Sequence, residues 1–361
     1  MSNKVYFLPW ERREELPKFL KAAKVFNHVK ARNFLAIKIH FGEDGNQGYI
    51  KPEYVAPVVK IAREKTAFPF LTDSSTIYAG KRSDAYHHLL IANKHGFTIE
   101  ACGCPVIIGD GLRGNNKQDV EVNLKHFKTV SVGRDIVQSD SFIFMNHFKG
   151  HEVTGFGGAL KNVGMGCASK EGKYAMHNSA KPSVKASKCT ACGTCVKNCY
   201  QNALSITSRS HPALTRERIK EGVVVMDRTK CAGCGQCIVS CAFGVFGLNW
   251  DEDPKVVQRK IVEYAAGVLK NKKASYINFL NHISKDCDCF GFLKNPPLMQ
   301  DVGIVAGTDP VAVDQASYDL VNKAYGKNFF KKIHPDVNPE IQLEYAEKIG
   351  LGTREYELIN Y

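Results

Sequence analysis

The sequence predicts an α/β protein with an open, mostly parallel or mixed sheet, helices on both faces, and an inserted ferredoxin-like two-cluster module. Three observations lead to this fold class. Short β-rich runs alternate with amphipathic helical runs before about residue 180, the alternation resumes after residue 251, and the interval between holds two four-cysteine runs. We therefore expect a discontinuous α/β domain made of residues 1–180 and 251–361, with residues 181–250 as the module.

Strands and helices alternate in the first part of the chain. The runs PEYVAPVVKIAREK (52–65) and SDAYHHLLIANKHG (83–96) carry apolar residues at helical spacing. Around them lie short runs rich in β-branched and aromatic residues, which predict strands. These runs are FLAIKIHF (34–41), FPFLT (68–72), CPVIIGD (104–110) and SFIFMNHF (141–148). Strands separated by helices indicate βαβ units and parallel pairing.

The same alternation continues after the cysteine runs. DPKVVQRKIVEYAAGVLKN (253–271) predicts a helix with Asp253 and Pro254 at its start. SYINFLNHI (275–283) and DVGIVAG (301–307) predict strands. DPVAVDQASYDLVNKAYG (309–326) predicts a helix that ends at Gly326.

Composition restricts the compartment and the partners. The chain has 13 cysteines, no signal-peptide stretch at its start and no apolar run of the roughly 20 residues that cross a bilayer. We therefore expect a cytoplasmic protein, without membrane insertion, whose cysteines bind metal. The net charge of +13 raises nucleic acid as a partner, but no helix-turn-helix, zinc-finger or basic–aromatic pattern accompanies it. Nucleic-acid binding is therefore not expected.

Two cysteine runs with the same CxxCxxCxxxC spacing predict two 4Fe–4S clusters. In this duplicated pattern, three cysteines of one run and the fourth cysteine of the other run hold each cluster. Tyr200 and Ala242 follow the fourth cysteines, where proline is the usual turn restraint. The alternative is zinc binding, which the repeated spacing disfavours. The pattern assigns Cys189, Cys192, Cys195 and Cys241 to cluster one, and Cys231, Cys234, Cys237 and Cys199 to cluster two.

The module is basic, which is unusual for a ferredoxin. Residues 181–250 contain ten Lys and Arg against three Asp and Glu, a net charge of 10 − 3 = +7. A basic face predicts docking of an acidic electron carrier such as a ferredoxin or flavodoxin. The alternative is a set of solvated surface lysines without a partner.

The densest polar segment outside the module is NHFKGHEVTGFGGALKNVGMGC (146–167). Its glycines, Gly155, Gly157 and Gly158, precede a short predicted helix and would let backbone N–H groups approach an anion. Lys161 and Asn162 lie on that helix, where the lysine could meet a phosphate or carboxylate. This pattern predicts a bound small anionic substrate or cofactor group, although it matches neither the Walker A nor the GxGxxG spacing. The alternative is a glycine-rich turn with surface histidines.

Five cysteines remain after the eight cluster ligands. A thiol taken alone is commonly a small buried hydrophobe, and this applies to Cys102 and Cys104. Cys287 and Cys289 differ because they follow a predicted strand as CxC, a spacing that can hold a metal or form a reactive dithiol. With Cys167 they are candidate ligands of a third metal or cluster.

Polar residues also follow several predicted strands. Ligands in an open α/β sheet bind outside the carboxyl ends of the strands, so these side chains are expected to converge on one crevice. There Lys38 would help to hold an anionic group, and His40 and His147 would transfer protons. Asp309 precedes Pro310 and is alternatively a helix N-cap. The remaining strand-end residues are Asp73, Ser74, Ser75, Asp110 and Asp314.

Three motifs together resemble one known family. KIHFGE (38–43), HFKGHEVTGFGGALKNVGMG (147–166) and GTDPVAVD (307–314), with a two-cluster insert, resemble the family named domain of unknown function 362. Members of that family often carry such an insert, and many are described as 4Fe–4S binding. The resemblance covers most of the chain and implies the α/β architecture without naming a substrate. It singles out Lys38, His40, His147, Lys161, Asn162, Asp309 and Asp314.

These patterns together predict an iron–sulfur oxidoreductase. Electrons would enter the module from the acidic carrier and pass to a substrate or a third metal centre in the α/β crevice, as in a ferredoxin-dependent oxidoreductase. Two other hypotheses remain open. The chain could be an electron-transfer subunit of a larger redox complex, or a maturation factor that handles a metal or cluster through Cys287 and Cys289.

Overall fold

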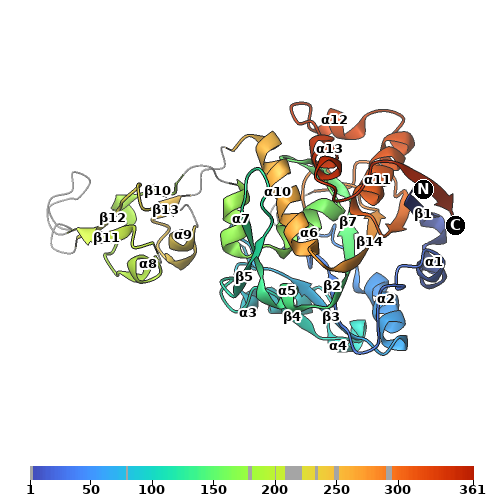
Figure 1. Cartoon of the computed structure of the whole chain (residues 1–361), viewed down its shortest axis with the longest axis horizontal. Helices are drawn as coiled ribbons and strands as arrows, with labels where there is room; N and C mark the ends of the chain where they lie inside the picture. The colour runs from blue at the N-terminus through green and yellow to red at the C-terminus, as the bar shows by residue number, and fades with distance from the viewer. Residues whose placement is uncertain are drawn as a thin grey trace. The chain divides into compact units, whose positions relative to one another are not determined.

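The computed structural model describes residues 3–78, 80–177, 181–199, 201–207, 222–231, 235–247, 252–289 and 295–361. The chain forms two compact units. The α/β unit consists of Met1–Ser169 and Pro254–Tyr361, and the cysteine module consists of Lys170–Asp253 (Figure 1). Among the described residues, the helices are all too short or too polar to span a membrane.

A sheet of eight described strands forms the centre of the α/β unit, in the order β16-β1-β15-β14-β7-β2-β3-β4. The run from β14 to β4 is parallel throughout, whereas β15 is antiparallel to both β14 and β1. The predicted α/β class with a mostly parallel sheet is therefore confirmed. The strands are β1 (Asn3–Pro9), β2 (Phe34–Lys38), β3 (Phe68–Asp73), β4 (Val106–Ile108), β7 (Ser141–His147), β14 (Lys273–Leu280), β15 (Gly303–Gly307) and β16 (Tyr356–Asn360).

Helices cover both faces of this sheet. On one face, Ile37 of β2 and Ile143 of β7 share a core with α1 (Leu16–Ala22), α2 (Pro52–Glu64) and α4 (Ile99–Cys102). Successive strand residues point to opposite faces, so Phe142 and Phe144 point to the other side. There α6 (Ala159–Cys167) and α11 (Pro310–Tyr325) pack on the strands, and α10 (Pro254–Leu269) packs on α6 (Figure 1).

The chain order of the strands places a switch point between β2 and β7. The chain runs outward from β2 to β3 and β4, and it then returns to β7 on the other side of β2. In open α/β sheets this reversal opens a crevice at the carboxyl ends of the two strands. The segments that follow β2 and β7 are therefore positioned to form a site.

Smaller elements complete the α/β unit. The hairpin of β8 and β9 leads into α6, and β5 pairs with β6. These elements are η1 (Trp10–Glu15), α3 (Ala85–Lys94), β5 (Lys117–Glu121), β6 (Thr129–Gly133), α5 (Arg134–Gln138), β8 (Lys149–His151), β9 (Gly155–Gly157), α12 (Phe329–Ile333) and α13 (Ile341–Lys348).

Gly164 fixes the position of α6, which carries Lys161 and Asn162. A Cβ atom on Gly164 would lie 2.1 Å from the backbone oxygen of Ile261 in α10. Alanine normally stabilises a helix interior by about 0.5–1 kcal/mol relative to glycine. We expect the reverse for Gly164→Ala, a loss of about 1–3 kcal/mol in urea unfolding, because the two backbones must separate. A variant as stable as the parent would show that α6 and α10 can separate without cost.

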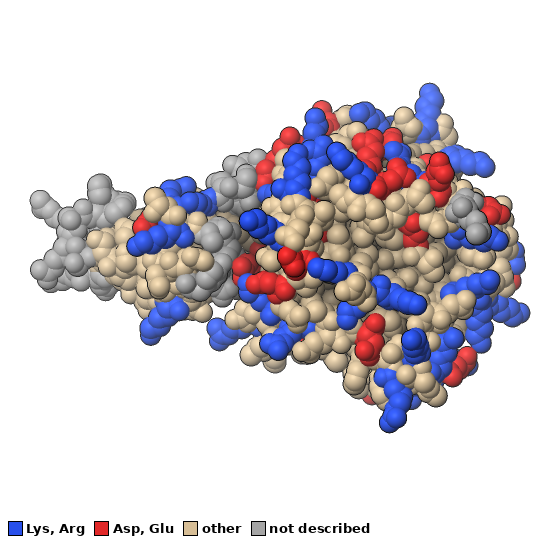
Figure 2. All heavy atoms as spheres, viewed as in Figure 1, with Lys and Arg blue, Asp and Glu red and all other residues tan. Residues whose placement is uncertain are grey.

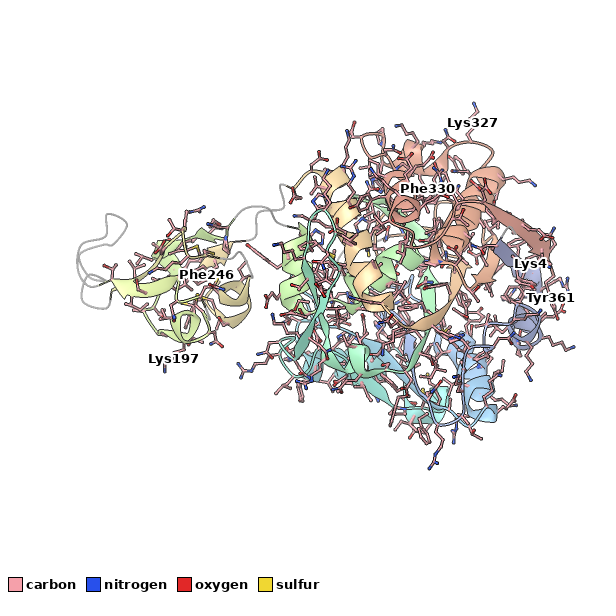
Figure 3. The ribbon with its side chains drawn as sticks, viewed as in Figure 1. Lys4, Lys197, Phe246, Lys327, Phe330 and Tyr361 are labelled. Carbon is pink, nitrogen blue, oxygen red and sulfur yellow. The ribbon has the colours of Figure 1, made fainter. Side chains whose placement is uncertain are left out.

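The cysteine module has an internal repeat. Two short helices, α8 (Thr194–Lys197) and α9 (Gln236–Ser240), pack together, and each follows a left-handed glycine, Gly193 or Gly235. Two antiparallel pairs accompany them, β10 (Ser183–Val184) with β13 (Phe246–Gly247), and β11 (Leu204–Thr207) with β12 (Val223–Met226). The module also contains α7 (Lys170–His177) and η2 (Ala186–Lys188). Phe246 lies in its core, whereas Lys197 is exposed (Figure 3).

Candidate functional site

Four cysteine sulfurs border one hollow in the module. Its lining includes Cys189, Cys192 and Cys195 from the first run and Cys241 from the second. The Sγ atom of Cys189 also accepts backbone N–H groups from Ala191 and Val224, each at 3.4 Å. Such N–H···S contacts tune the sulfurs that hold iron–sulfur clusters. These four cysteines are the set that the sequence assigns to cluster one.

The second predicted ligand set is described only in part. Cys199, Cys231 and Cys237 lie within the described residues, and Cys234 lies outside them. The Sγ atom of Cys199 accepts the N–H of Ala203 at 3.3 Å. The twelve described cysteines are all free of disulfide bonds.

A second constellation lies beyond the carboxyl ends of β2 and β7, in the α/β unit. The loop after β14 carries Cys287 and Cys289, and Nζ of Lys161 lies 3.1 Å from the first sulfur and 4.0 Å from the second. Nε2 of His40 lies 3.8 Å from Sγ of Cys289. The structure therefore brings together four residues that the sequence singled out in three separate segments.

The two thiols of this pair have very different acidities. A hydrogen bond from Cys287 lowers the pKa of Cys289 to about 5, against the effect of burial, and the charges of Lys161 and Arg82 lower the pKa further. The same hydrogen bond, together with burial, raises the pKa of Cys287 to about 12. Cys289 is therefore the more acidic thiol of the pair.

Arg82 and Tyr78 support Cys289, and the sequence reasoning missed both. Arg82 is 1% exposed, and its Nη2 donates to the Tyr78 hydroxyl at 2.7 Å. Tyr78 in turn hydrogen-bonds Cys289, and burial above all raises the pKa of Tyr78. The Arg82 guanidinium also contacts Glu43 at 3.3 Å and Asp73 at 3.5 Å. Both missed residues lie in a loop without a recognised motif.

His40 is a neutral hydrogen-bond donor toward Cys289. Its Nδ1 accepts the backbone N–H of Gly42 at 3.0 Å, so we assign the ring proton to Nε2. Burial, reinforced by the charge of Arg82, lowers the pKa of His40 to about 3. The neutral ring thus points an N–H group at the sulfur, which stabilises negative charge there.

His147, for which proton transfer is predicted, has both ring nitrogens engaged by neighbouring acceptors. Its Nδ1 lies 2.7 Å from Oδ2 of Asp288, and its Nε2 lies 2.8 Å from the backbone oxygen of Asn281. A backbone oxygen only accepts, and surrounding positive charge keeps the pKa of Asp288 well below its ordinary value despite burial. Both ring nitrogens therefore face acceptors, and His147 anchors the loop that carries the cysteine pair.

Lys38 begins a buried chain of polar contacts. Its Nζ lies 2.9 Å from Oδ1 of Asp73 and donates to Oδ1 of Asn162 at 2.7 Å. Asn162 continues this buried chain by donating to Asn146 at 2.7 Å. The charge of Lys38 is thus matched by Asp73, and its contacts connect α6 to β2 and β3.

The predicted anion-binding glycine loop already contains an anion from the chain itself. The Asp314 carboxylate accepts the N–H of Ala159 at 2.7 Å and that of Leu160 at 2.9 Å, at the start of α6. A Cβ on Gly158 would lie 2.3 Å from this carboxylate. On the preceding β9, Gly157 allows Lys161 to approach, and Gly155 has a φ of 76°. Gly157 and Gly158 therefore leave room for side chains of the protein itself, Lys161 and Asp314. The Asp314 carboxylate occupies the N-terminus of α6, where the sequence predicts an anion.

Some strand-end residues lie away from the crevice. Asp309 follows the antiparallel strand β15, so it lies near the amino ends of the parallel strands and not at their carboxyl ends. There its Oδ1 accepts the N–H groups of Val311 and Ala312 as a helix cap. Asp110 accepts from Ser75, and Ser74 donates to the end of α6. The Cys167 sulfur contacts the Asn162 backbone oxygen at 3.9 Å. Within the described ranges, no three His, Cys, Asp or Glu side chains lie together as a metal site. Cys167 is therefore not grouped with Cys287 and Cys289 there.

The fold and this site define an α/β protein whose mixed sheet carries a buried thiol site at the carboxyl ends of its central strands. The chain belongs to the family described as Domain of unknown function (DUF362), which matches residues 35–319.

Comparisons with other proteins add distant similarities only. The chain is similar to the solved structure of the lactate racemase apoprotein from Thermoanaerobacterium thermosaccharolyticum, with 12% identity and a TM-score of 0.39 over 76% of this chain and 50% of that one. It is also similar to a crystal structure of a protein from Thermotoga maritima, with 10% identity and a TM-score of 0.38 over 87% of this chain and 58% of that one. This chain thus spans half of the first of these chains and 58% of the second. No curated protein sequence matches it.

Proposed function

We propose that this protein is an iron–sulfur oxidoreductase that binds two 4Fe–4S clusters in its cysteine module and passes electrons to the thiol site of the α/β unit. The observation that carries the proposal is the hollow bordered by Cys189, Cys192, Cys195 and Cys241. Cysteines from two separate runs share one hollow there, as interlocked cluster binding requires. Each bound cluster would accept and donate one electron at a time.

The spacing of these cysteines supports a cluster over a zinc ion. The hollow is bordered by cysteines of two runs with the same CxxCxxCxxxC spacing, and this duplicated spacing is typical of paired 4Fe–4S clusters. Apolar side chains of Ile206, Val224 and Val245 also line the hollow. Reducing conditions keep such thiolates available, so we propose a cytoplasmic location.

Exposed basic side chains support docking of an acidic electron carrier. Lys and Arg outnumber Asp and Glu on the visible surface of the module (Figure 2). Opposite charge on a carrier such as a ferredoxin or flavodoxin would speed association at low salt. The exposed basic residues of the module include Lys185, Lys188, Lys197, Arg228 and Lys230.

The α/β site favours chemistry over a scaffold role. Lys38, Arg82 and Lys161 are all at least nine-tenths buried and lie close to the acids and thiols described above. Burying charges costs free energy that apolar residues of the same volume would avoid, so a scaffold gains nothing from this arrangement. A maturation factor is less well supported, because Cys287 and Cys289 have no third described protein ligand for a metal.

The metal content of anaerobically purified protein tests the proposal. We expect about eight iron atoms and as many acid-labile sulfides per chain, with a spectrum that bleaches on reduction by dithionite. Cys241→Ser should remove about half of the iron by releasing cluster one, although Cys241 belongs to the second run. Zinc in place of iron would refute the proposal.

A matched pair of variants tests the interlocked ligand assignment. Cys199→Ser should release cluster two in the same way, whereas Cys102→Ala, in the core of the α/β unit, should keep all of the iron. Full iron content in both Cys199→Ser and Cys241→Ser would refute the assignment of these two cysteines as cluster ligands.

A further inference from the structure

We propose that Cys287 and Cys289 are a redox-active pair that forms a reversible disulfide, with Cys289 as the sulfur that attacks a disulfide-bearing substrate. This inference deepens the proposed function and rests on it only for the supply of electrons. Its basis is the surroundings of the two sulfurs, which differ sharply from those of a second CxC pair in the same chain.

The second pair, Cys102 and Cys104, has the same spacing but lies in the hydrophobic core of the sheet and α2. Burial raises the pKa of Cys102 to about 11 and that of Cys104 to about 12. Burial is the largest cause of both pKa shifts, and both thiols pack among apolar side chains. CxC spacing alone therefore does not make a redox site in this protein. The side chains around the two sulfurs determine whether the pair can react.

Polar donors surround Cys287 and Cys289. Lys161 lies 3.1 Å from one sulfur and 4.0 Å from the other, and His40 lies 3.8 Å from Cys289. Thiolates held by such donors are the nucleophiles of thiol–disulfide exchange. Cys289 is partly exposed as a residue and Cys287 is buried, so we assign Cys289 as the attacking sulfur.

The loop geometry suits a bond between the two sulfurs. Asp288 and Cys289 lie in a turn, which shortens the distance between the two cysteine Cα atoms compared with an extended strand. Asp288 between them is held by His147 at 2.7 Å and by Lys149 at 3.4 Å. His147 and Lys149 are therefore positioning residues that keep the turn in place while the sulfurs react.

The proposed exchange balances in two steps. The Cys289 thiolate attacks one sulfur of the substrate disulfide, which forms a mixed disulfide and releases one substrate thiolate. Cys287 then attacks Sγ of Cys289, the Cys287–Cys289 bond forms, and the second substrate thiolate leaves with the Cys287 proton. Two electrons and one proton restore the pair, the electrons coming from one-electron carriers under the proposed function. Lys161, in contact with Cys287, is placed to return the proton.

Redox titration of the holoprotein tests the pair directly. The protein is equilibrated anaerobically in a series of reduced and oxidised glutathione, and thiols are then alkylated and identified by peptide mass spectrometry. We expect a Cys287–Cys289 disulfide that forms and disappears reversibly, while Cys102 and Cys104 stay alkylatable after unfolding. Cys287→Ser should trap glutathione on Cys289, whereas Cys289→Ser should trap at least tenfold less on Cys287. The Cys102→Ala/Cys104→Ala variant should titrate like the parent.

The outcomes separate this inference from the proposed function. A pair that stays reduced in the most oxidising buffer, equal trapping by both serine variants, or a metal ion that protects both thiols would each overturn the redox pair. Iron-free protein whose pair still exchanges with glutathione would refute the cluster proposal and leave the pair intact. Protein with its full iron content but a cysteine pair that does not exchange with glutathione would refute the redox pair and leave the cluster proposal intact.

Discussion

Asp73→Ala is expected to lower the free energy of unfolding by about 3–5 kcal/mol, because the change leaves buried cations without their partner. Oδ1 of Asp73 lies 2.9 Å from Nζ of Lys38, and Oδ2 lies 3.5 Å from Nη1 of Arg82. All three side chains are at most 4% exposed, so water cannot replace the lost carboxylate. Urea unfolding followed by circular dichroism measures the loss.

A surface ion pair provides the matched control for Asp73. Asp44 lies only 2.6 Å from Nζ of Lys94, but both side chains are exposed. Asp44→Ala should cost less than about 1 kcal/mol, because solvent screens exposed pairs. Equal losses in the two variants would contradict the view that burial, and not distance, sets the contribution.

The pH dependence of stability follows from the same carboxylate. Burial alone would raise the pKa of Asp73, but the charges of Lys38, His88, His40 and Arg82 outweigh it and lower the pKa far below the ordinary value of 3.8. The stabilisation is therefore fully present above about pH 4 and is lost as the pH falls toward the folded-state pKa. Asp73→Asn should remove this acid-dependent loss, because the amide does not titrate.

The sheet could be predicted from the sequence because its central strands are buried on both faces. Runs such as SFIFMNHF and FLAIKIHF are almost continuously apolar, as parallel strands require, and they became β7 and β2. The strands β1 and β16 at one edge were missed, since their burial is only partial. The antiparallel direction of β15 could not be read from its composition, so Asp309 was placed at the wrong end of the sheet.

The positions of the site residues could be predicted from the sequence, but the partners of their side chains could not. Lys161, His40 and the CxC pair were found because polar residues at strand ends and thiols after a strand stand out in a sequence. Whether a charged side chain faces a ligand or another residue depends on contacts between distant segments. Asp314 occupies the start of α6 from 155 positions away, and Asp73 neutralises Lys38 across two strands. Neither pairing leaves a local pattern.

Lys161→Met is expected to raise the pKa of Cys289 by about 1–3 units, because it removes the positive charge that lowers this pKa most. The Cys287 hydrogen bond, Lys161 and Arg82 together hold that pKa at about 5, so Cys289 should react with iodoacetamide across neutral pH in the parent protein. In the variant the midpoint of the pH–rate profile should shift to higher pH, and alkylation at pH 6 should slow severalfold. Peptide mass spectrometry assigns the alkylated site.

Two substitutions separate charge from packing at Lys161. Lys161→Arg keeps the positive charge and should hold the midpoint low, whereas Lys94→Met removes an exposed lysine paired with Asp44 and should leave the profile unchanged. The lowered pKa also means that Cys289 stabilises the fold above its unfolded pKa near 8.5 and loses that contribution as the pH falls through about 5. Lys161→Met should therefore weaken the acid-dependent part of stability and slow alkylation together. If Lys161→Met changed the stability but kept the midpoint of the alkylation pH–rate profile, Lys161 would not lower the pKa of Cys289. The low pKa would then be due to Cys287 and Arg82 alone.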